Sequence, residues 1–160
     1  MIGRRSSRRR AFSLLEAMAI VVMVAVAVPP MASIAQSNAV RAGDATRRHA
    51  AMHLAVGVME AVLADSESTH PLLGFHGFAR TDYLDAPIIG LRSRLARLEE
   101  PAAAFGITYE VSFSDPFSAA GDPATADADL ALRIVTVRAA WATVMGRDGS
   151  IELKTAVVNR

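Results

Sequence analysis

The stretch Arg8-Arg9-Arg10-Ala11-Phe12-Ser13-Leu14-Leu15-Glu16 decides the fold of this chain, because it runs directly into a largely apolar segment from Ala17 to Ala35. An apolar segment of about 20 residues is long enough to cross a bilayer as a helix. Glu16 lies near the start of this segment, and a carboxylate at a bilayer centre costs about 2.5–3.5 kcal/mol on insertion scales. The sequence therefore predicts a membrane-spanning helix that carries a carboxylate for a specific reason.

The charge of the chain is distributed unevenly along its 160 residues. Five arginines lie between positions 4 and 10, before the first acidic residue, Glu16. The formal net charge is +1, but without those five arginines 12 basic residues face 16 acidic ones, a net charge of −4. Basicity is thus a property of the N-terminus, and we expect no nucleic-acid binding by the folded part. The chain has no cysteine, which excludes a disulfide scaffold.

Three interpretations of the N-terminus are compatible with this pattern. The arginines place the N-terminus in the cytoplasm by the positive-inside bias. In the first interpretation, a peptidase cuts between Ala11 and Phe12 and leaves the apolar segment as an anchor. In the second, a signal peptidase cuts after the small-x-small site Ser33-Ile34-Ala35. In the third, nothing is cut and the segment is a plain anchor. Glu16 argues against the second interpretation, because a charge has no use at the start of a secretory signal.

The residues from Phe12 to about Asp65 are predicted to form one long helix. Pro29 and Pro30 remove two backbone donors, so we expect a kink or local unwinding there. After Gln36 the pattern changes from apolar on all sides to amphipathic. A stripe of apolar residues at spacings of four, three and four is predicted to face the rest of the fold; it consists of Met52, Val56, Met59 and Leu63.

The middle of the chain contains weaker signals. The polar residues from 65 to 70 and Pro71 are predicted to end the long helix, and Leu72 to Pro87 is predicted to be loop. A short helix is expected from Ile88 to Glu99, stopped by Pro101. Its apolar face would contain Ile88, Leu91, Leu95 and Leu98, with Arg92, Arg94 and Arg97 off that face.

The C-terminal third is predicted to form strands at 107–113, 130–144 and 150–158, because apolar and polar residues alternate there. The turn signal Gly146-Arg147-Asp148-Gly149 joins the last two. Leu132 and Ile134 have the opposite parity to Val135, which suggests a bulge or a change of face near Ile134. The expected fold class is α+β, with the amphipathic half of the long helix covering a three-stranded antiparallel sheet.

This order of elements resembles type IV pilin-like proteins. The basic leader, Ala11, Phe12 and Glu16 are similar to a prepilin-type cleavage and methylation motif, although Ala11 stands where the family usually has Gly. The segments Arg133–Val137 and Ile151–Thr155, with Trp141 and Gly146 between them, look like the I-type minor pseudopilins of type II secretion and the V-type minor pilins.

The resemblance implies a non-enzymatic structural subunit of a type II secretion or type IV pilus filament. It implies cleavage between Ala11 and Phe12, N-methylation of Phe12, and a role for Glu16 in assembly. The implied partners are other pilin-like subunits, a prepilin peptidase, an inner-membrane assembly platform and the lipid bilayer. The implied location is the inner membrane, with a single span, a cytoplasmic N-terminus and a periplasmic C-terminal part.

The implied organisation is a leader at 1–11, a transmembrane assembly helix at 12–35 and a pilin-like part at 36–160. The last comprises a helix continuation at 36–65, a loop and short helix at 66–101, and the sheet at 106–158. The alternative is an uncleaved, membrane-anchored periplasmic binding or scaffold domain.

Physical chemistry supports the role given to Glu16. Cleavage creates an ammonium on Phe12 that methylation leaves charged. In a low-dielectric filament core, that ammonium of one subunit can pair with Glu16 of its neighbour, which offsets the burial of both charges. In the alternative interpretation Glu16 lies near the membrane surface and its carboxylate reaches the interface.

Three other clusters of reactive side chains are interpreted as structural. A pair of histidines four apart has the spacing of a helical metal site but lacks a third ligand. An acidic loop has irregular spacing for a cation, and a serine–histidine group lacks a nucleophile elbow. These clusters are His49 with His53, Asp122 with Asp127 and Asp129, and Ser66 and Ser68 with His70. We therefore expect no catalytic residue, metal or cofactor.

Overall fold

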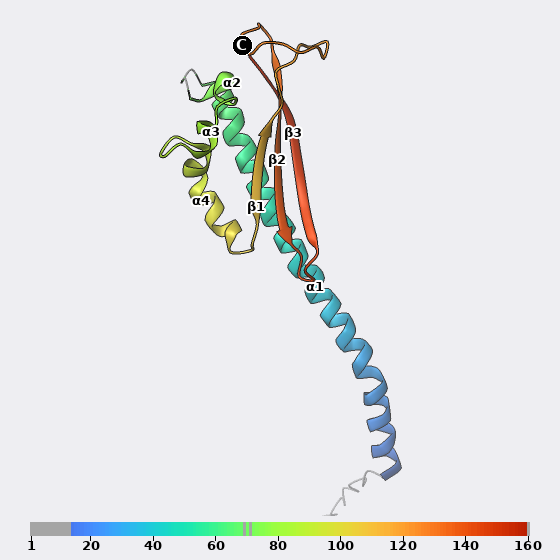
Figure 1. The fold of residues 1–160 in the computed structure, drawn as a ribbon. Helices are drawn as coiled ribbons and strands as arrows, with labels where there is room; N and C mark the ends of the chain where they lie inside the picture. The colour runs from blue at the N-terminus through green and yellow to red at the C-terminus, as the bar shows by residue number, and fades with distance from the viewer. Residues whose placement is uncertain (1–13, 69, 71, 160) are drawn as a thin grey trace, which may run out of the picture. The chain divides into compact units, whose positions relative to one another are not determined.

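The computed structural model describes residues 14–68, 70 and 72–159 (Figure 1). The chain divides into two compact units, residues 1–41 and residues 42–160, and we call the second unit the head. The elements are α1 (Leu14–Ser66), α2 (Gly74–Gly77), α3 (Asp82–Asp85), α4 (Leu91–Ala103), β1 (Thr108–Phe113), β2 (Leu132–Ala142) and β3 (Asp148–Val158). The predicted α+β fold class, with a long N-terminal helix and a three-stranded antiparallel sheet, is confirmed.

Helix α1 contains 53 residues and ends at Ser66, close to the predicted end at Asp65. The predicted start at Phe12 lies outside the described residues. Pro29 and Pro30 are both inside α1, and the helical conformation continues through them. Of the two expected outcomes, local unwinding is therefore wrong, and a kink stays a prediction. Each proline removes one backbone donor, but its fixed φ is compatible with a helix, and the neighbouring turns keep their conformation.

The sheet has the strand order β1-β2-β3 with antiparallel pairing throughout, as predicted. Val111 of β1 pairs with Val137 of β2, which pairs with Leu153 of β3. The alternation in β2 follows the prediction: Val135, Val137 and Ala139 are fully buried and Trp141 is nearly so. The β2–β3 hairpin closes through a turn in which the Thr143 amide donates to the carbonyl of Arg147. A turn joins the last two strands as predicted, but it precedes Asp148, and Asp148 and Gly149 of the predicted turn belong to β3.

The predicted bulge near Ile134 is absent from the sheet. The β2–β3 register runs without interruption from Leu132 opposite Val158 to Ala142 opposite Asp148. The core-facing position two residues before Val135 is occupied by Arg133, which is only 6% exposed. Its guanidinium carbon lies 5.2 Å from the centre of the Phe75 ring. An arginine can take a core-facing position because its stem packs among apolar groups and its charge can lie over an aromatic ring.

Helix α1 packs on the sheet, but through a different stripe from the one predicted. Met52 and Leu63 of the predicted stripe are 42% and 38% exposed. The buried face of α1 is displaced from the predicted stripe by about one residue. Only Met59 belongs to both sets. The buried residues of α1 are Ala51, Leu54, Ala55, Val58, Met59, Val62 and Asp65. Ala51 and Ala55, both with small side chains, are completely buried in this face.

The connection between α1 and the sheet is more ordered than predicted. The range from Leu72 to Pro87, expected to be loop, contains the short helices α2 and α3. The predicted short helix exists as α4, but Ile88 lies before it and is 86% exposed, and Pro101 lies inside it instead of stopping it. Leu91 and Leu95 are buried as expected.

Helix α4 packs against α1 at a glycine. A Cβ atom at Gly57 would lie 2.5 Å from Cδ2 of Leu98, so the two helices touch where α1 has no side chain. An aromatic cluster joins the middle segment to the sheet: the Phe78 and Phe113 rings stack with their centres 4.7 Å apart, and Tyr83 meets both rings edge-on. The core therefore has α1 in the middle, with the sheet and α4 packed on it (Figure 1).

Candidate assembly segment and polar contacts of the head

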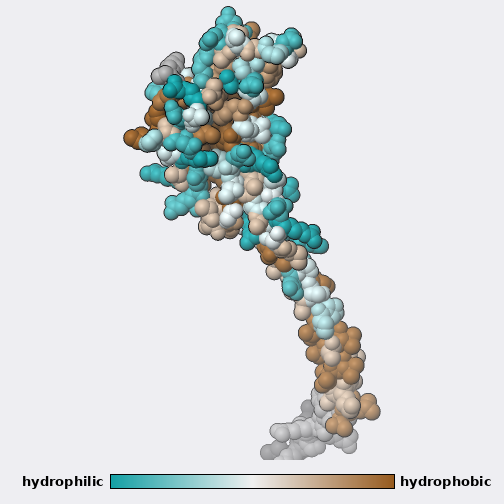
Figure 2. All heavy atoms as spheres, viewed as in Figure 1, coloured by the Kyte–Doolittle hydropathy of each residue, from teal (hydrophilic) through white to brown (hydrophobic). Residues whose placement is uncertain are grey.

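The first part of α1 is an exposed apolar surface. Twelve large apolar side chains between Leu14 and Ile34 are each between 46% and 81% exposed. Within the described residues, α1 is the one helix long and apolar enough to cross a membrane, and none of its most apolar stretch is buried. Figure 2 shows this surface as a continuous apolar band along the helix. Length and composition therefore allow this segment to cross a membrane.

Glu16 lies in the first turn of α1 and is exposed. A carboxylate in the first turn interacts favourably with the backbone amides and the dipole at the helix N-terminus, which is worth about 0.3–1 kcal/mol at exposed positions. The predicted cleavage site, Ala11 and Phe12, lies outside the described residues.

The most ordered polar site of the head joins the end of α1 to α3 and α4. Asp65 is 5% exposed and accepts hydrogen bonds from both terminal nitrogens of Arg94, with Arg94 Nη1 at 2.7 Å from Oδ1. The Tyr83 hydroxyl donates to Asp65 Oδ2 at 2.7 Å, and Tyr83 is 1% exposed. Arg94 Nε donates to the carbonyl of Ile89. The carboxylate therefore holds three segments together with charge-assisted hydrogen bonds.

Sequence reasoning missed this site because it treated Asp65 as a helix-ending polar residue and Arg94 as an off-face surface residue. The positions of the buried residues contain a signal. Asp65 follows Ala51, Ala55, Val58 and Val62 at spacings of four, three, four and three. An acidic residue at the end of a buried stripe needs a cationic or hydroxyl partner, so the pattern predicts a buried acceptor once the correct stripe is known.

Both tyrosines of the head have raised pKa values. Burial raises the pKa of Tyr83 well above its ordinary value, and the hydrogen bond to Asp65 adds to the effect. Burial also raises the pKa of Tyr109, whose hydroxyl donates to Glu99 Oε1 at 2.6 Å. The hydrogen bonds from Arg94 to Asp65 raise the pKa of that guanidinium. Tyr109 and Glu99 thus join β1 to α4 in the way that Tyr83 and Asp65 join α3 to α1.

We expect the folded protein to show little tyrosinate absorbance near pH 10, because Tyr83 and Tyr109 are the two tyrosines of the chain. In the unfolded chain both should ionise at about pH 10. The unfolded state then releases protons that the folded state keeps, so the free energy of unfolding should fall as pH rises above about 10. Spectrophotometric titration of the full-length protein in mild detergent, with and without denaturant, measures this difference. An ordinary tyrosine midpoint in the folded protein would contradict it.

The β2–β3 hairpin is fastened to α1 by two side chains of the helix. Arg47 Nη1 donates to the carbonyl of Ala142 at 2.6 Å, and the Val144 amide donates to Asp44 Oδ1 at 2.7 Å. A Cβ atom at Gly43 would lie 2.9 Å from Cγ2 of Val144. The absence of a side chain at position 43 therefore lets the hairpin turn lie directly on the helix.

The three clusters considered from the sequence lie on the surface of the head. His49 and His53 are exposed, with ring centres 4.8 Å apart. Asp122, Asp127 and Asp129 are exposed in the loop between β1 and β2. Among the described residues, no group of three or more histidine and acidic side chains is arranged to hold a metal ion. Ser66 ends α1, and the Ser68 hydroxyl accepts a hydrogen bond from the His70 amide.

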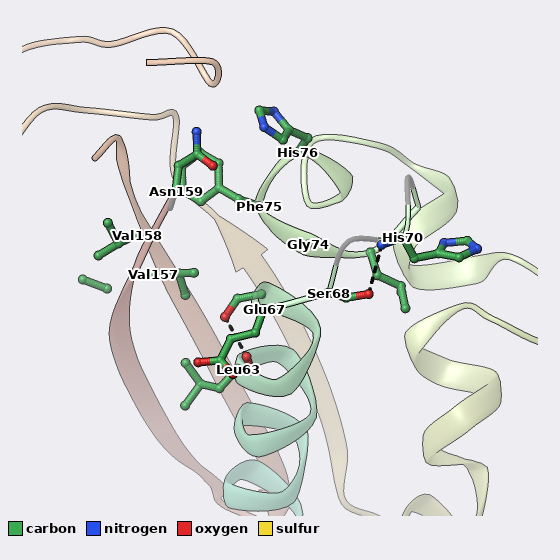
Figure 3. Close-up of a pocket in the computed structure, with 13 residues that line it drawn as sticks. Leu63, Glu67, Ser68, His70, Gly74, Phe75, His76, Val157, Val158 and Asn159 are labelled. Carbon is green, nitrogen blue, oxygen red and sulfur yellow. Dashed lines mark hydrogen bonds between the residues drawn. The ribbon is translucent and has the colours of Figure 1, made fainter. Parts of the chain in front are cut away.

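A cavity of about 690 Å³ lies between the end of α1, the α2 segment and the end of β3 (Figure 3). Its apolar lining includes Leu63, Leu73, Phe75 and Val157, and its polar lining includes Glu67, His70, His76 and Asn159. Both histidines and Glu67 are exposed. The lining mixes apolar and polar side chains, and its polar part is the larger.

No protein-family model, curated protein or solved structure was found to match this chain.

Proposed function

We propose that this protein is a non-enzymatic structural subunit of a filament of the type II secretion or type IV pilus class, in the manner of a minor pseudopilin or pilin. The observation that supports this proposal most is the exposed apolar part of α1 with Glu16 in its first turn. A chain of this class is stored in the inner membrane through that segment, with a cytoplasmic N-terminus and a periplasmic head. It later enters a filament in which neighbouring helices replace the lipid.

The exposed apolar surface requires a cover. Twelve large apolar side chains are exposed between Leu14 and Ile34. Burying such side chains stabilises by about 1.5–3 kcal/mol each, on the order of 20 kcal/mol for the set. A bilayer and a bundle of similar helices both supply this burial, which makes storage in a membrane and release into a helical bundle energetically comparable. The arginines between positions 4 and 10 fit a leader that a prepilin peptidase removes between Ala11 and Phe12.

In the assembled state, the methylated ammonium of Phe12 in one subunit pairs with Glu16 of its neighbour. The pairing fixes the stagger between subunits, because both charges are costly in an apolar bundle unless they meet. The partners are other pilin-like subunits, the peptidase and an inner-membrane assembly platform. The head then serves as the surface on which subunits contact one another.

A second candidate function is an uncleaved, membrane-anchored binding or scaffold domain. The cavity between α1, α2 and β3 favours it, because a concave site lined by both apolar and polar side chains offers contacts to a ligand. Cleavage at the leader distinguishes this candidate from the filament subunit.

We expect the mature protein to begin at N-methylated Phe12. Removing residues 1–11 and adding one methyl group changes the intact mass by a defined amount, and N-terminal sequencing identifies the first residue. Protein purified from its own host is the material for this measurement, because the peptidase must be present. A mature start at Gln36 would establish the secretory-signal interpretation, and an intact leader would establish the anchored domain.

A further inference from the structure

Two turns at one end of the head expose apolar side chains. Among the described residues of the head, eight large apolar side chains are exposed, and three of them belong to these turns. Phe105 is 42% exposed in the turn between α4 and β1, and Val144 and Met145 are 46% and 70% exposed in the turn between β2 and β3. Both turns lie at the end of the sheet where β1 begins and β2 ends (Figure 1). Exposed apolar groups gathered in one place mark an interaction surface.

The charge of this end is opposite in sign to the net charge of the head. We call residues 43–48, 104–106 and 143–148 the basal end. It contains three arginines and two acids, a net charge of +1, whereas the whole head has 11 basic and 15 acidic residues, a net charge of −4. The charged residues of the basal end are Asp44, Arg47, Arg48, Arg147 and Asp148. An anionic partner is therefore favoured here over the rest of the head surface.

Contacts with α1 hold the β2–β3 turn in place. Asp44 and Arg47 of the helix hydrogen-bond to the backbone of the hairpin, at 2.7 and 2.6 Å. Arg48 and Arg147 are exposed, and within the described residues neither side chain makes a hydrogen bond or an ion pair. The basal end thus presents its apolar residues on a fixed frame, beside two guanidinium groups that can pair with phosphate oxygens.

The chain keeps the basal end close to the segment that is long and apolar enough to cross a membrane. Gly43, which contacts the turn at Val144, follows Ala35 at the end of the apolar run by eight positions, all of them in α1. A helix rises about 1.5 Å per residue, so these eight positions extend at most about 12 Å. The headgroup layer on each side of a bilayer is about 5–8 Å thick. When α1 spans a bilayer, the basal end is therefore within reach of the headgroups.

A bilayer surface fits the basal end better than a second copy of this chain does. Two copies anchored in one membrane present the same arginines at the same height, so their basal ends repel each other. A bilayer offers phosphates to the arginines and, directly beneath them, an apolar layer to the exposed side chains. Two turns also supply little area, which suits shallow insertion, whereas a stable protein interface buries about 800 Å² on each partner.

We infer that the basal end docks on the surface of the bilayer that α1 spans. The three apolar side chains lie at the boundary between headgroups and acyl chains, and Arg48 and Arg147 bind lipid phosphates. The inference rests on the proposed storage of the protein in a membrane. Docking holds the head against the membrane before assembly, so this contact must be released when the subunit enters a filament.

The test measures the depth of single spin labels, which the absence of cysteine allows. Full-length Met145→Cys and Leu130→Cys carry a nitroxide and are reconstituted, one copy per disc, in nanodiscs of phosphatidylglycerol and phosphatidylcholine in equal amounts. Leu130 is the matched control, because it is 68% exposed and lies just before β2, at the opposite end of the sheet. Collision rates with oxygen, which concentrates in lipid, and with a water-soluble nickel complex give the depth. We expect the label at position 145 at or below the lipid phosphates and the label at position 130 in water.

Charge variants test the phosphate contacts with the label at position 145. Arg48→Gln and Arg147→Gln should each lower the ratio of docked to free heads about fivefold, the contribution of one arginine near an anionic surface. Arg80→Gln is the charge-matched control and should leave the ratio unchanged, because Arg80 is exposed next to α2, at the opposite end of the head (Figure 1). Discs of phosphatidylcholine alone, or added salt, should also reduce docking.

Equal access of the nickel complex to the labels at positions 145 and 130 would overturn the inference and leave membrane storage intact. Low collision rates with both reagents at position 145 would show burial against protein instead of lipid, and would also overturn it, as would equal effects of Arg147→Gln and Arg80→Gln. A chain that does not enter the discs would contradict membrane storage itself, and the inference with it. Phe105→Cys labels the second turn and should give the same depth, so it replaces Met145→Cys if that variant does not fold.

Discussion

Glu16→Ala should prevent incorporation of this protein into a filament while leaving its insertion and its head intact. Alanine is a good helix former and adds no bulk to the apolar segment, and removing the carboxylate lowers the cost of placing that segment in a bilayer. In the assembled state, however, the neighbour's Phe12 ammonium would be buried without its partner. An uncompensated buried charge costs about 3–5 kcal/mol, which for each subunit contact is a reduction of more than a hundredfold in the association constant.

Two matched variants separate charge from shape. Glu16→Gln keeps the size and loses the charge, so it should show most of the defect, and Glu16→Asp keeps the charge on a shorter side chain and should be intermediate. The measurement is crosslinking or co-purification with pilin-like subunits from the same operon, normalised to the amount in the membrane. If the alanine variant associates normally at a normal membrane level, the role of Glu16 is limited to the helix N-terminus or the membrane interface, and the anchored-domain function is favoured.

The strands and the long helix could be predicted because each follows from a local pattern. Val135, Val137, Ala139 and Trp141 alternate with Thr136, Arg138 and Ala140, and burial follows that alternation residue by residue. The apolar run after Glu16 gives the helix without any tertiary information. The turn at Gly146 was also readable, because its φ of 73° suits glycine.

The face of α1 that packs on the sheet was not predicted correctly, because the stripe was chosen by side-chain size. Met52 and Leu63 are large and apolar, but Ala51 and Ala55 are fully buried in their place. Small apolar side chains can belong to the face of a helix that packs on a sheet, so the size of a side chain does not identify that face. Leu63 lies at the flank of this face, where it lines the cavity next to the end of β3.

The buried polar residues were missed for a related reason. Arg133 occupies an inward position of β2. Because we expected only apolar residues on the inward face of a strand, we predicted a bulge near this position. Its burial lowers the pKa of the guanidinium, a cost that its contact with Phe75 and its hydrogen bond to the Ser114 carbonyl partly offset. The partners of Arg133 and of Asp65 come from distant segments, so no local window of sequence contains the pairing.

Asp65→Ala should lower the free energy of unfolding of the head by about 2–4 kcal/mol. The substitution leaves the Tyr83 hydroxyl buried without its acceptor and removes both hydrogen bonds from Arg94. The Arg94 side chain is 32% exposed, so water can solvate part of the released charge, and the expected loss is smaller than for a completely buried pair. Urea unfolding of the full-length protein in detergent, followed by the fluorescence of Trp141, measures the change; Trp141 is the one tryptophan and is 8% exposed.

A variant without the polar partners tests whether the loss comes from unsatisfied groups or from the missing ion pair itself. Replacing a buried ion pair by apolar residues of similar volume is often neutral or stabilising. The combination Asp65→Leu, Arg94→Met and Tyr83→Phe should therefore be more stable than Asp65→Ala alone, although it has fewer hydrogen bonds. If the triple variant is the less stable of the two, the charge-assisted bonds stabilise the head beyond the cost of their burial. A loss below about 0.5 kcal/mol for Asp65→Ala, the range of ordinary surface substitutions, would mean that α1, α3 and α4 are held by apolar packing alone.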